Sequence, residues 1–116
     1  MSLPLTPHML AAAYDFLREC PPFKGWKLPD SDAVQFHVTR HRDRYADHNT
    51  VREEHVIRVS SYHTKTTDSL MQAVAHELIH VRQAQTKDRG IHGPSFRRAA
   101  TQVCRAHGWD LKEFIG

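Results

Sequence analysis

Cysteine is scarce in this sequence, and the two residues present, Cys20 and Cys104, lie far apart without forming a C-x-x-C pair. A zinc ribbon built on four cysteines is therefore excluded. Residues 1–6 also lack the basic stretch and the apolar core of a secretory leader. We therefore expect reduced thiols and a cytoplasmic location rather than a disulfide framework.

Long apolar runs and low-complexity tracts are missing as well. A membrane-spanning helix needs about 20 consecutive apolar residues, and no segment approaches that length, which excludes a helical membrane protein. Hydrophobic residues make up 40% of the 116 residues and charged residues 25%, as in ordinary globular proteins. The sequence therefore predicts one small domain over residues 1–116.

Histidine, in contrast, is abundant, with ten residues in the chain. The net charge is only +3, which permits nucleic-acid binding without implying it. Half of the histidines lie in predicted strands and turns without the spacing of a ligand set, and we interpret them as exposed or satisfied side chains. These are His37, His41, His48, His55 and His63.

Periodicity predicts an α+β fold in which a helix is followed by three strands and then by two helices. Proline and glycine near the predicted boundaries, and alternating β-branched or aromatic residues in the strands, support this order. The expected elements are a helix over residues 6–20, strands over 34–39, 44–46 and 54–60, a turn at 47–49, and helices over 67–84 and 94–107.

The central predicted helix contains His76-Glu77-Leu78-Ile79-His80, an H-E-x-x-H motif. Residues four apart in a helix are separated by about 6 Å along the axis and about 40° around it. Both imidazoles can therefore reach one zinc ion at about 2.0–2.1 Å. Zinc lowers the pKa of a bound water toward about 7, and Glu77 is placed to contact that water without being a ligand. Glu77 is predicted to act as general base and then as general acid.

The alternative is two ordinary histidines with a solvated glutamate between them. Chance predicts roughly 0.04 such motifs in a chain of this composition. Three ionisable groups on a mostly apolar helix are also costly unless a site uses them. The metal site is therefore the preferred interpretation.

Zinc hydrolases usually supply three protein ligands and leave the fourth position to water. The metzincin extension of the motif is absent, because Gln83 stands where its glycine would be and Thr86 where its third histidine would be. The best candidate for a third ligand is His92, since Gly93 and Pro94 would fix its direction just before the last predicted helix. The other candidates are Asp88, His107, Asp110 and Glu113.

The H-E-x-x-H motif followed by His92-Gly93-Pro94-x-Phe96 resembles the SprT-like (Spartan-type) family of zinc metallopeptidases. The strand at residues 56–60 and the approach to the motif over residues 70–76 are also similar to that family. The resemblance covers residues 10–109. Many members of the family carry a C-terminal zinc ribbon, which this sequence lacks. The resemblance is therefore to the catalytic core of the family.

This resemblance implies a minimal zincin-like fold with one zinc ion. It implies His76, His80 and His92 as the ligands and Glu77 as the catalytic acid and base. It also implies an exposed strand edge above the cleft, to which an extended substrate could add as a further strand. We expect residues 54–60 to form that edge.

Two further groups of residues are weaker candidates. Tyr62 and His63 follow the predicted edge strand and could stabilise a tetrahedral oxyanion, although they could equally be loop residues without a role. A basic strip could contact the phosphates of a nucleic acid, although it could also be the solvated face of an edge strand. That strip consists of Arg40, Arg42 and Arg44.

The function expected from the sequence is a zinc-dependent metalloendopeptidase that hydrolyses peptide bonds of protein substrates, with DNA-associated proteins among them. Two alternatives remain open. One is a nucleic-acid-binding module with a structural zinc ion, for which DNA would be the partner. The other is a zinc hydrolase that acts on a non-peptide amide.

Overall fold

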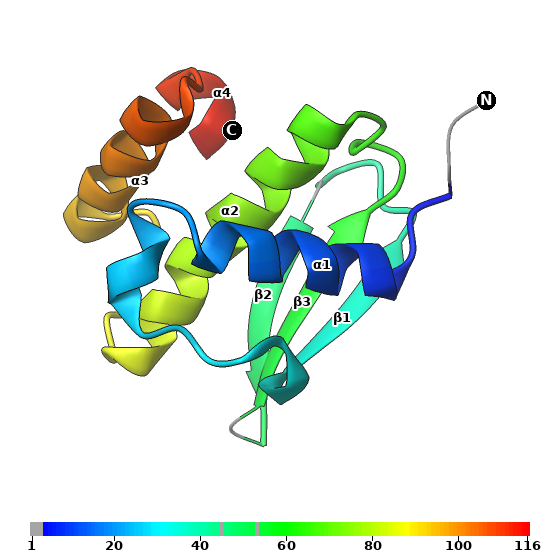
Figure 1. Ribbon diagram of the computed structural model, residues 1–116, viewed down its shortest axis with the longest axis horizontal. Helices are drawn as coiled ribbons and strands as arrows, with labels where there is room; N and C mark the ends of the chain where they lie inside the picture. The colour runs from blue at the N-terminus through cyan, green and yellow to red at the C-terminus, as the bar shows by residue number, and fades with distance from the viewer. Residues whose placement is uncertain (1–3, 45, 53) are drawn as a thin grey trace.

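The computed structural model describes residues 4–44, 46–52 and 54–116. Its architecture is α+β, as predicted, with four helices and one three-stranded sheet (Figure 1). The elements are α1 (Pro7–Arg18), β1 (Val34–Thr39), β2 (Ala46–Val51), β3 (Glu54–Ser60), α2 (Thr67–Gln85), α3 (Pro94–His107) and α4 (Leu111–Ile115), with short 3-10 helices at Phe23–Trp26 and Ser31–Ala33.

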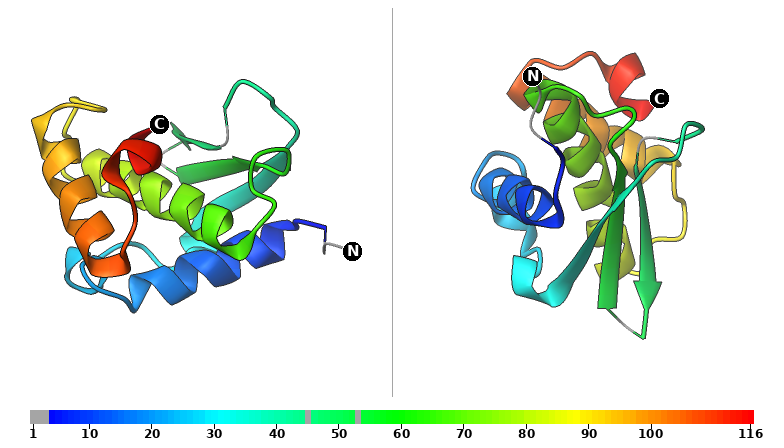
Figure 2. Two further views of the ribbon diagram at one scale, coloured as in Figure 1. Left: turned by 90° about the horizontal axis from the view of Figure 1, so that it is seen from above. Right: turned by 90° about the vertical axis from the view of Figure 1, so that its right-hand side faces the viewer.

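Helix α2 is the centre of the fold, as its apolar pattern predicted. It packs against α1, α3, α4, β2 and β3. Helices α1 and α2 lie on the same face of the sheet (Figure 2). A capping box begins α2, because the Thr66 hydroxyl accepts from the Ser69 amide and the Ser69 hydroxyl accepts from the Thr66 amide. This capping box fixes where α2 begins.

The strand order in the sheet is β1-β3-β2. Strand β3 is parallel to β1 and antiparallel to β2. The expectation that residues 54–60 form the exposed edge is therefore wrong, since β3 is the central strand and β2 the edge beside α2. The difference has a physical reason: β3 carries the buried residues Val56, Ile57 and Val59, whereas no residue of β2 is buried.

Strand β2 also differs from its predicted bounds. The strand predicted at 44–46 runs instead over Ala46–Val51, so the turn expected at 47–49 is wrong; residue 45 lies outside the described part of the chain. Asp47 and Asn49 pair with Arg58 and Val56 of β3 in antiparallel register. This pairing outweighs the turn preference of Asp and Asn, because strand propensity depends on context.

The last helix was not predicted. The side chain of Asp110 accepts a hydrogen bond from the Glu113 amide at 3.1 Å and begins α4, which is only 5 residues long. Phe114 is buried in the core with 1% of its surface exposed. Such a short helix has little local signal, and it is stabilised by the burial of Phe114 and by the packing of Leu111 and Ile115 against the core.

Among the described residues, no helix combines the length and the apolar character that crossing a membrane requires.

Candidate metal centre

The two histidines of the H-E-x-x-H motif lie on one side of α2, and His92 approaches them from the loop before α3. One ring nitrogen from each of His76, His80 and His92 lies within 4.8 Å of the others. The ring centroids are 5.0 Å apart for His76 and His80, 5.5 Å for His76 and His92, and 5.1 Å for His80 and His92. This set of three imidazole nitrogens suits a zinc ion.

Phe96 in the first turn of α3 supports all three rings. Its ring centroid lies 5.0 Å from that of His76, 5.0 Å from that of His80 and 4.8 Å from that of His92. Phe96 is fully buried, so it anchors the start of α3 in the core. The H-G-P-x-F segment therefore positions His92 through the packing of Phe96.

Hydrogen bonds determine the tautomers of the two helical histidines. Nδ1 of His76 lies 3.0 Å from the backbone carbonyl oxygen of Phe114, which can only accept. Nδ1 of His80 lies 2.8 Å from Oε1 of Gln83. Both Nδ1 atoms therefore carry the proton, and both Nε2 atoms carry the lone pair that a metal requires.

Both imidazoles are also held neutral by their surroundings. Burial lowers the pKa of His76 to about 4, although the hydrogen bond to Phe114 opposes the shift. Burial likewise lowers the pKa of His80. A neutral imidazole is the form that ligates a metal, so the cluster is prepared for a cation near neutral pH.

Glu77 is almost completely buried, with 2% of its surface exposed. Its Oε1 atom has no hydrogen-bond partner among the residues that the structure describes. Burial raises the pKa of Glu77 to about 8, and the charge of Asp47 adds to the rise. An unsatisfied buried carboxyl oxygen is costly, and a metal with its water beside the three histidines would supply the missing partner. The residues present therefore fit a metal ion such as zinc.

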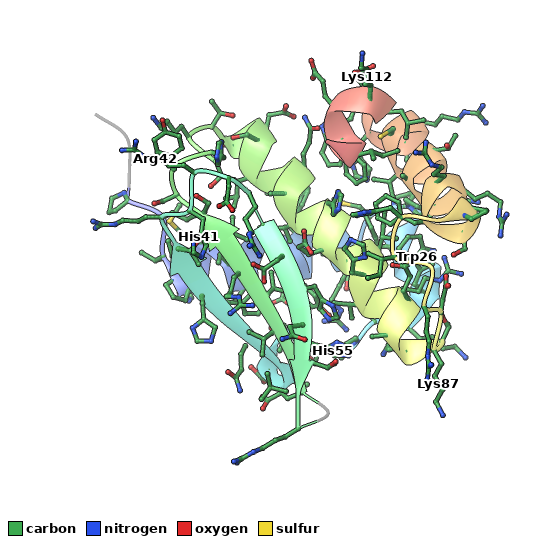
Figure 3. The ribbon with its side chains drawn as sticks, turned by 180° about the vertical axis from the view of Figure 1, so that it is seen from behind. Trp26, His41, Arg42, His55, Lys87 and Lys112 are labelled. Atoms are coloured by element: carbon green, nitrogen blue, oxygen red, sulfur yellow. The ribbon has the colours of Figure 1, made fainter. Side chains whose placement is uncertain are left out.

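A cleft of about 380 Å³ contains this cluster. One wall is formed by residues 46–50 of β2, and the other by His76, Glu77, His80 and the loop around His92. Strand β2 stands directly beside α2 when the molecule is seen from behind (Figure 3). The cleft thus runs along the exposed edge of the sheet, with Glu77 and the three histidines facing it.

The other third-ligand candidates have different surroundings. Asp88 lines the cleft, but its carboxylate accepts from the Ser95 hydroxyl and from the Gly90 amide. The ring of His107 hydrogen-bonds to the carbonyl of Pro21 at 2.8 Å. Asp110 and Glu113 begin α4. Of the five candidates, the structure brings His92 together with His76 and His80.

Tyr62 and His63 are not brought to this cleft. They follow β3, where Tyr62 is 45% exposed and contacts the Arg42 guanidinium, which lies 5.2 Å from its ring centroid. The ring of His63 hydrogen-bonds to the backbone carbonyl of Arg42. Neither residue lines the wall formed by β2, α2 and the His92 loop. The geometry therefore gives no support to either as the oxyanion stabiliser.

The three arginines of the predicted basic strip lie in the loop between β1 and β2 rather than on a strand. Arg44 lies 3.5 Å from a carboxylate oxygen of Asp47 and 3.9 Å from one of Asp43, and Arg42 packs over Tyr62. Arg42 is at the opposite end of the molecule from Lys87, which follows α2 (Figure 3). Arg40 is exposed in the same loop. Arg42 and Arg44 thus have partners within the protein.

Three contributors to the site were missed from the sequence. His48 was interpreted as an isolated histidine, yet it lines the cleft, and its Nε2 lies 2.9 Å from Nδ1 of His55. The carbonyl of Phe114 and the side chain of Gln83 orient the two helical histidines. The role of His48 follows only from the register of the β2–β3 hairpin, and that of Phe114 only from the packing of α4. Gln83 could have been found from the sequence, because it lies three residues after His80 on the same helix.

The model of the SprT-like family matches residues 19–113, a range that includes the whole sheet, the H-E-x-x-H helix and His92. None of the curated proteins matches the chain.

Proposed function

This chain belongs to the SprT-like family, and from that membership and the geometry of its cleft we propose that it is a zinc-dependent metallopeptidase. The observation that carries the proposal is the combination of three converging histidines with a buried, unsatisfied glutamate in one cleft. A purely structural zinc site is closed by protein ligands and has no use for such a carboxylate.

The chemistry assigns each residue a role. When bound by His76, His80 and His92, zinc would polarise the carbonyl of the scissile bond and lower the pKa of a water toward about 7. Glu77 accepts a proton from the attacking water and returns it to the amine that leaves. A neighbouring cation favours the ionised form of Glu77, which opposes the effect of burial.

The substrate that fits this cleft is an extended peptide segment. Strand β2 is a sheet edge, and its residues 46–50 form one wall of the cleft opposite Glu77. A peptide that pairs with β2 would run along the cleft, with main-chain hydrogen bonds providing affinity. Flexible regions of proteins supply such segments, so we assign protein or peptide substrates.

The deciding experiment compares wild type with Glu77→Gln on a flexible protein substrate. The variant should retain zinc in metal analysis and lose hydrolysis by a factor of about 10² or more. Glu19→Gln, which changes an exposed glutamate at the end of α1, is the matched control and should cleave like wild type. Cleavage by Glu77→Gln at the wild-type rate would overturn the role of Glu77.

The same assay separates the alternatives. Cleavage that requires single-stranded DNA and is lost in Glu77→Gln would make DNA a partner of the peptidase. Salt-dependent DNA binding by a zinc-loaded protein that cleaves neither proteins nor peptides would instead favour the binding module. Hydrolysis of a small amide without peptide cleavage would favour a zinc hydrolase that acts on non-peptide amides.

A further inference from the structure

Gln83 is a buried polar residue that the proposed chemistry does not use. It lies in the last turn of α2, three residues after His80, with 7% of its surface exposed. Residues three apart on a helix are neighbours on its surface. Burying an amide requires hydrogen-bond partners, and those of Gln83 connect two parts of the metal centre.

The partners of Gln83 determine which way its amide points. Its Nε2 atom lies 3.0 Å from the carbonyl oxygen of Gly90 and 3.4 Å from Oδ2 of Asp88. The Gly90 carbonyl can only accept, so the amino group of Gln83 must face the loop. Its Oε1 atom therefore faces α2, where it lies 2.8 Å from Nδ1 of His80.

This orientation acts on His80. Because Oε1 can only accept, Nδ1 of His80 must donate, and the lone pair must be on Nε2. The opposite tautomer would place a proton on the atom that the metal needs. Gln83 thus selects the metal-ready form of His80 through hydrogen bonds that fix its own orientation.

The same amide acts on the loop that carries His92. The Gly90 carbonyl that accepts from Gln83 also accepts from the Gly93 amide at 2.9 Å. Asp88 is bonded to Gln83, to the Gly90 amide and to the Ser95 hydroxyl. The segment on both sides of His92 is therefore tied to α2 through one side chain.

We propose that Gln83 is a positioning residue of the metal centre, which couples His80 on α2 to the His92 loop and so raises the affinity for the metal. The inference rests on the proposed zinc site. Hydrogen-bonding partners of metal ligands typically change metal affinity by about 10–100-fold. A residue that only stabilised the end of α2 would change the free energy of unfolding and leave the tautomer of His80 unaffected.

Two substitutions separate the two halves of this role. Gln83→Leu removes the acceptor for His80 and the donor for Gly90. Gln83→Glu keeps an acceptor for His80 but cannot donate to Gly90, and it faces Asp88 with a like charge. The matched control is Gln85→Leu, since Gln85 is an exposed glutamine in the same helical turn.

Two readouts are measured on each variant: zinc affinity by competition with a chelator, and the tautomer of each histidine ring from ¹⁵N NMR of the metal-free protein. We expect Gln83→Leu to bind zinc about 10–100-fold more weakly and to lose the Nδ1–H form of His80. His76, held by Phe114, should keep its tautomer in the same spectrum. Gln83→Glu should keep the His80 tautomer and still bind zinc more weakly, and Gln85→Leu should behave like wild type.

The outcomes distinguish this inference from the proposed function. If wild type itself binds no zinc, the proposed function fails. If wild type binds zinc and Gln83→Leu binds it equally, or keeps the Nδ1–H form of His80, the positioning role is overturned. Should Gln83→Leu fail to fold, Gln83→Glu decides, since unchanged zinc affinity there would refute the coupling to the loop.

Discussion

The backbone carbonyl of Phe114 lies 3.0 Å from Nδ1 of His76, a residue 38 positions earlier in the chain. This hydrogen bond makes α4 part of the metal centre, because it determines which nitrogen of His76 carries the lone pair. The side chain of Phe114 holds the carbonyl in place from within the core, where it stacks on Trp109 with ring centroids 5.8 Å apart.

The first prediction concerns that anchor. Phe114→Ala should destabilise the metal-free protein by about 3–5 kcal/mol, because it leaves a cavity in the core. It should also weaken zinc binding by about tenfold or more, since the partner of His76 is displaced. Urea unfolding in the presence of a chelator measures the first effect, and chelator competition measures the second. Phe16→Ala is the control, because Phe16 is 58% exposed. Equal losses of stability and of zinc affinity in both variants would contradict the role of Phe114 in the metal centre.

The second prediction concerns the contribution of zinc to stability. A ligand that binds only the folded state at 1,000 times its dissociation constant stabilises that state by about 4.1 kcal/mol. Added zinc should therefore raise the melting temperature of wild type, and a chelator should reverse the rise. His92→Ala should melt like wild type without zinc, since His92 is exposed, and should respond far less to zinc. A full zinc response in His92→Ala would remove His92 from the ligand set.

The third prediction is a pH dependence that comes from His48. Burial lowers the pKa of His48 to about 4 from its ordinary value of 6.5; His55 and His80 lower it further, whereas Asp47 opposes the shift. The folded protein therefore binds fewer protons than the unfolded chain between these values. The contribution of His48 to the free energy of unfolding should be constant above about pH 6.5 and should fall as the pH decreases toward about 4.

A substitution isolates this contribution. His48→Asn should remove roughly 1–2 kcal/mol of the acid-induced loss, allowing for the partial exposure of the ring. The measurement is urea unfolding of the metal-free protein at pH 7 and pH 4.5. His41→Asn, in the exposed β1–β2 loop, is the control. If both variants show the wild-type pH dependence, the half-buried His48 is not its source.

The fourth prediction tests strand addition at β2. If the substrate pairs with this edge, N-methylation of those of its amides that face β2 removes main-chain hydrogen bonds. Each lost bond is worth about 0.5–1.5 kcal/mol, so kcat/KM should fall roughly 2–10-fold for each such position. Methylation of the alternate amides, which point away from β2, should have little effect. Equal losses at all positions would contradict binding along this edge.

Some elements of this fold depend on local sequence, and others depend on contacts between distant residues. The helix with its H-E-x-x-H motif and the strands at residues 34–39 and 54–60 follow from periodicity within short segments, and the structure has them at those positions. The spacing of His76 and His80 on one side of α2 follows from helix geometry alone. Those two residues and Glu77 could therefore be identified without any knowledge of the fold.

The order of the strands could not be identified in this way. Strand β2 becomes the edge because β3 pairs with β1 on one side and with β2 on the other. The pairing partner of a strand depends on contacts between residues that are distant in the sequence. It therefore cannot be predicted from the sequence of that strand alone. For this reason the expected substrate edge was placed on β3, and His48 was not recognised as a residue of the cleft.

What the sequence by itself determined is the chemistry: a pair of histidines and a glutamate on one buried helix, within a chain of the SprT-like family. The sequence also favoured His92 as the third ligand, but only the tertiary structure decided among the candidates and showed which residues orient the histidines. His92 joins the pair because Phe96 is buried beneath all three rings, and the tautomers of His76 and His80 depend on Phe114 and Gln83. These contacts need atoms within about 3–5 Å of one another, and folding alone brings them that close.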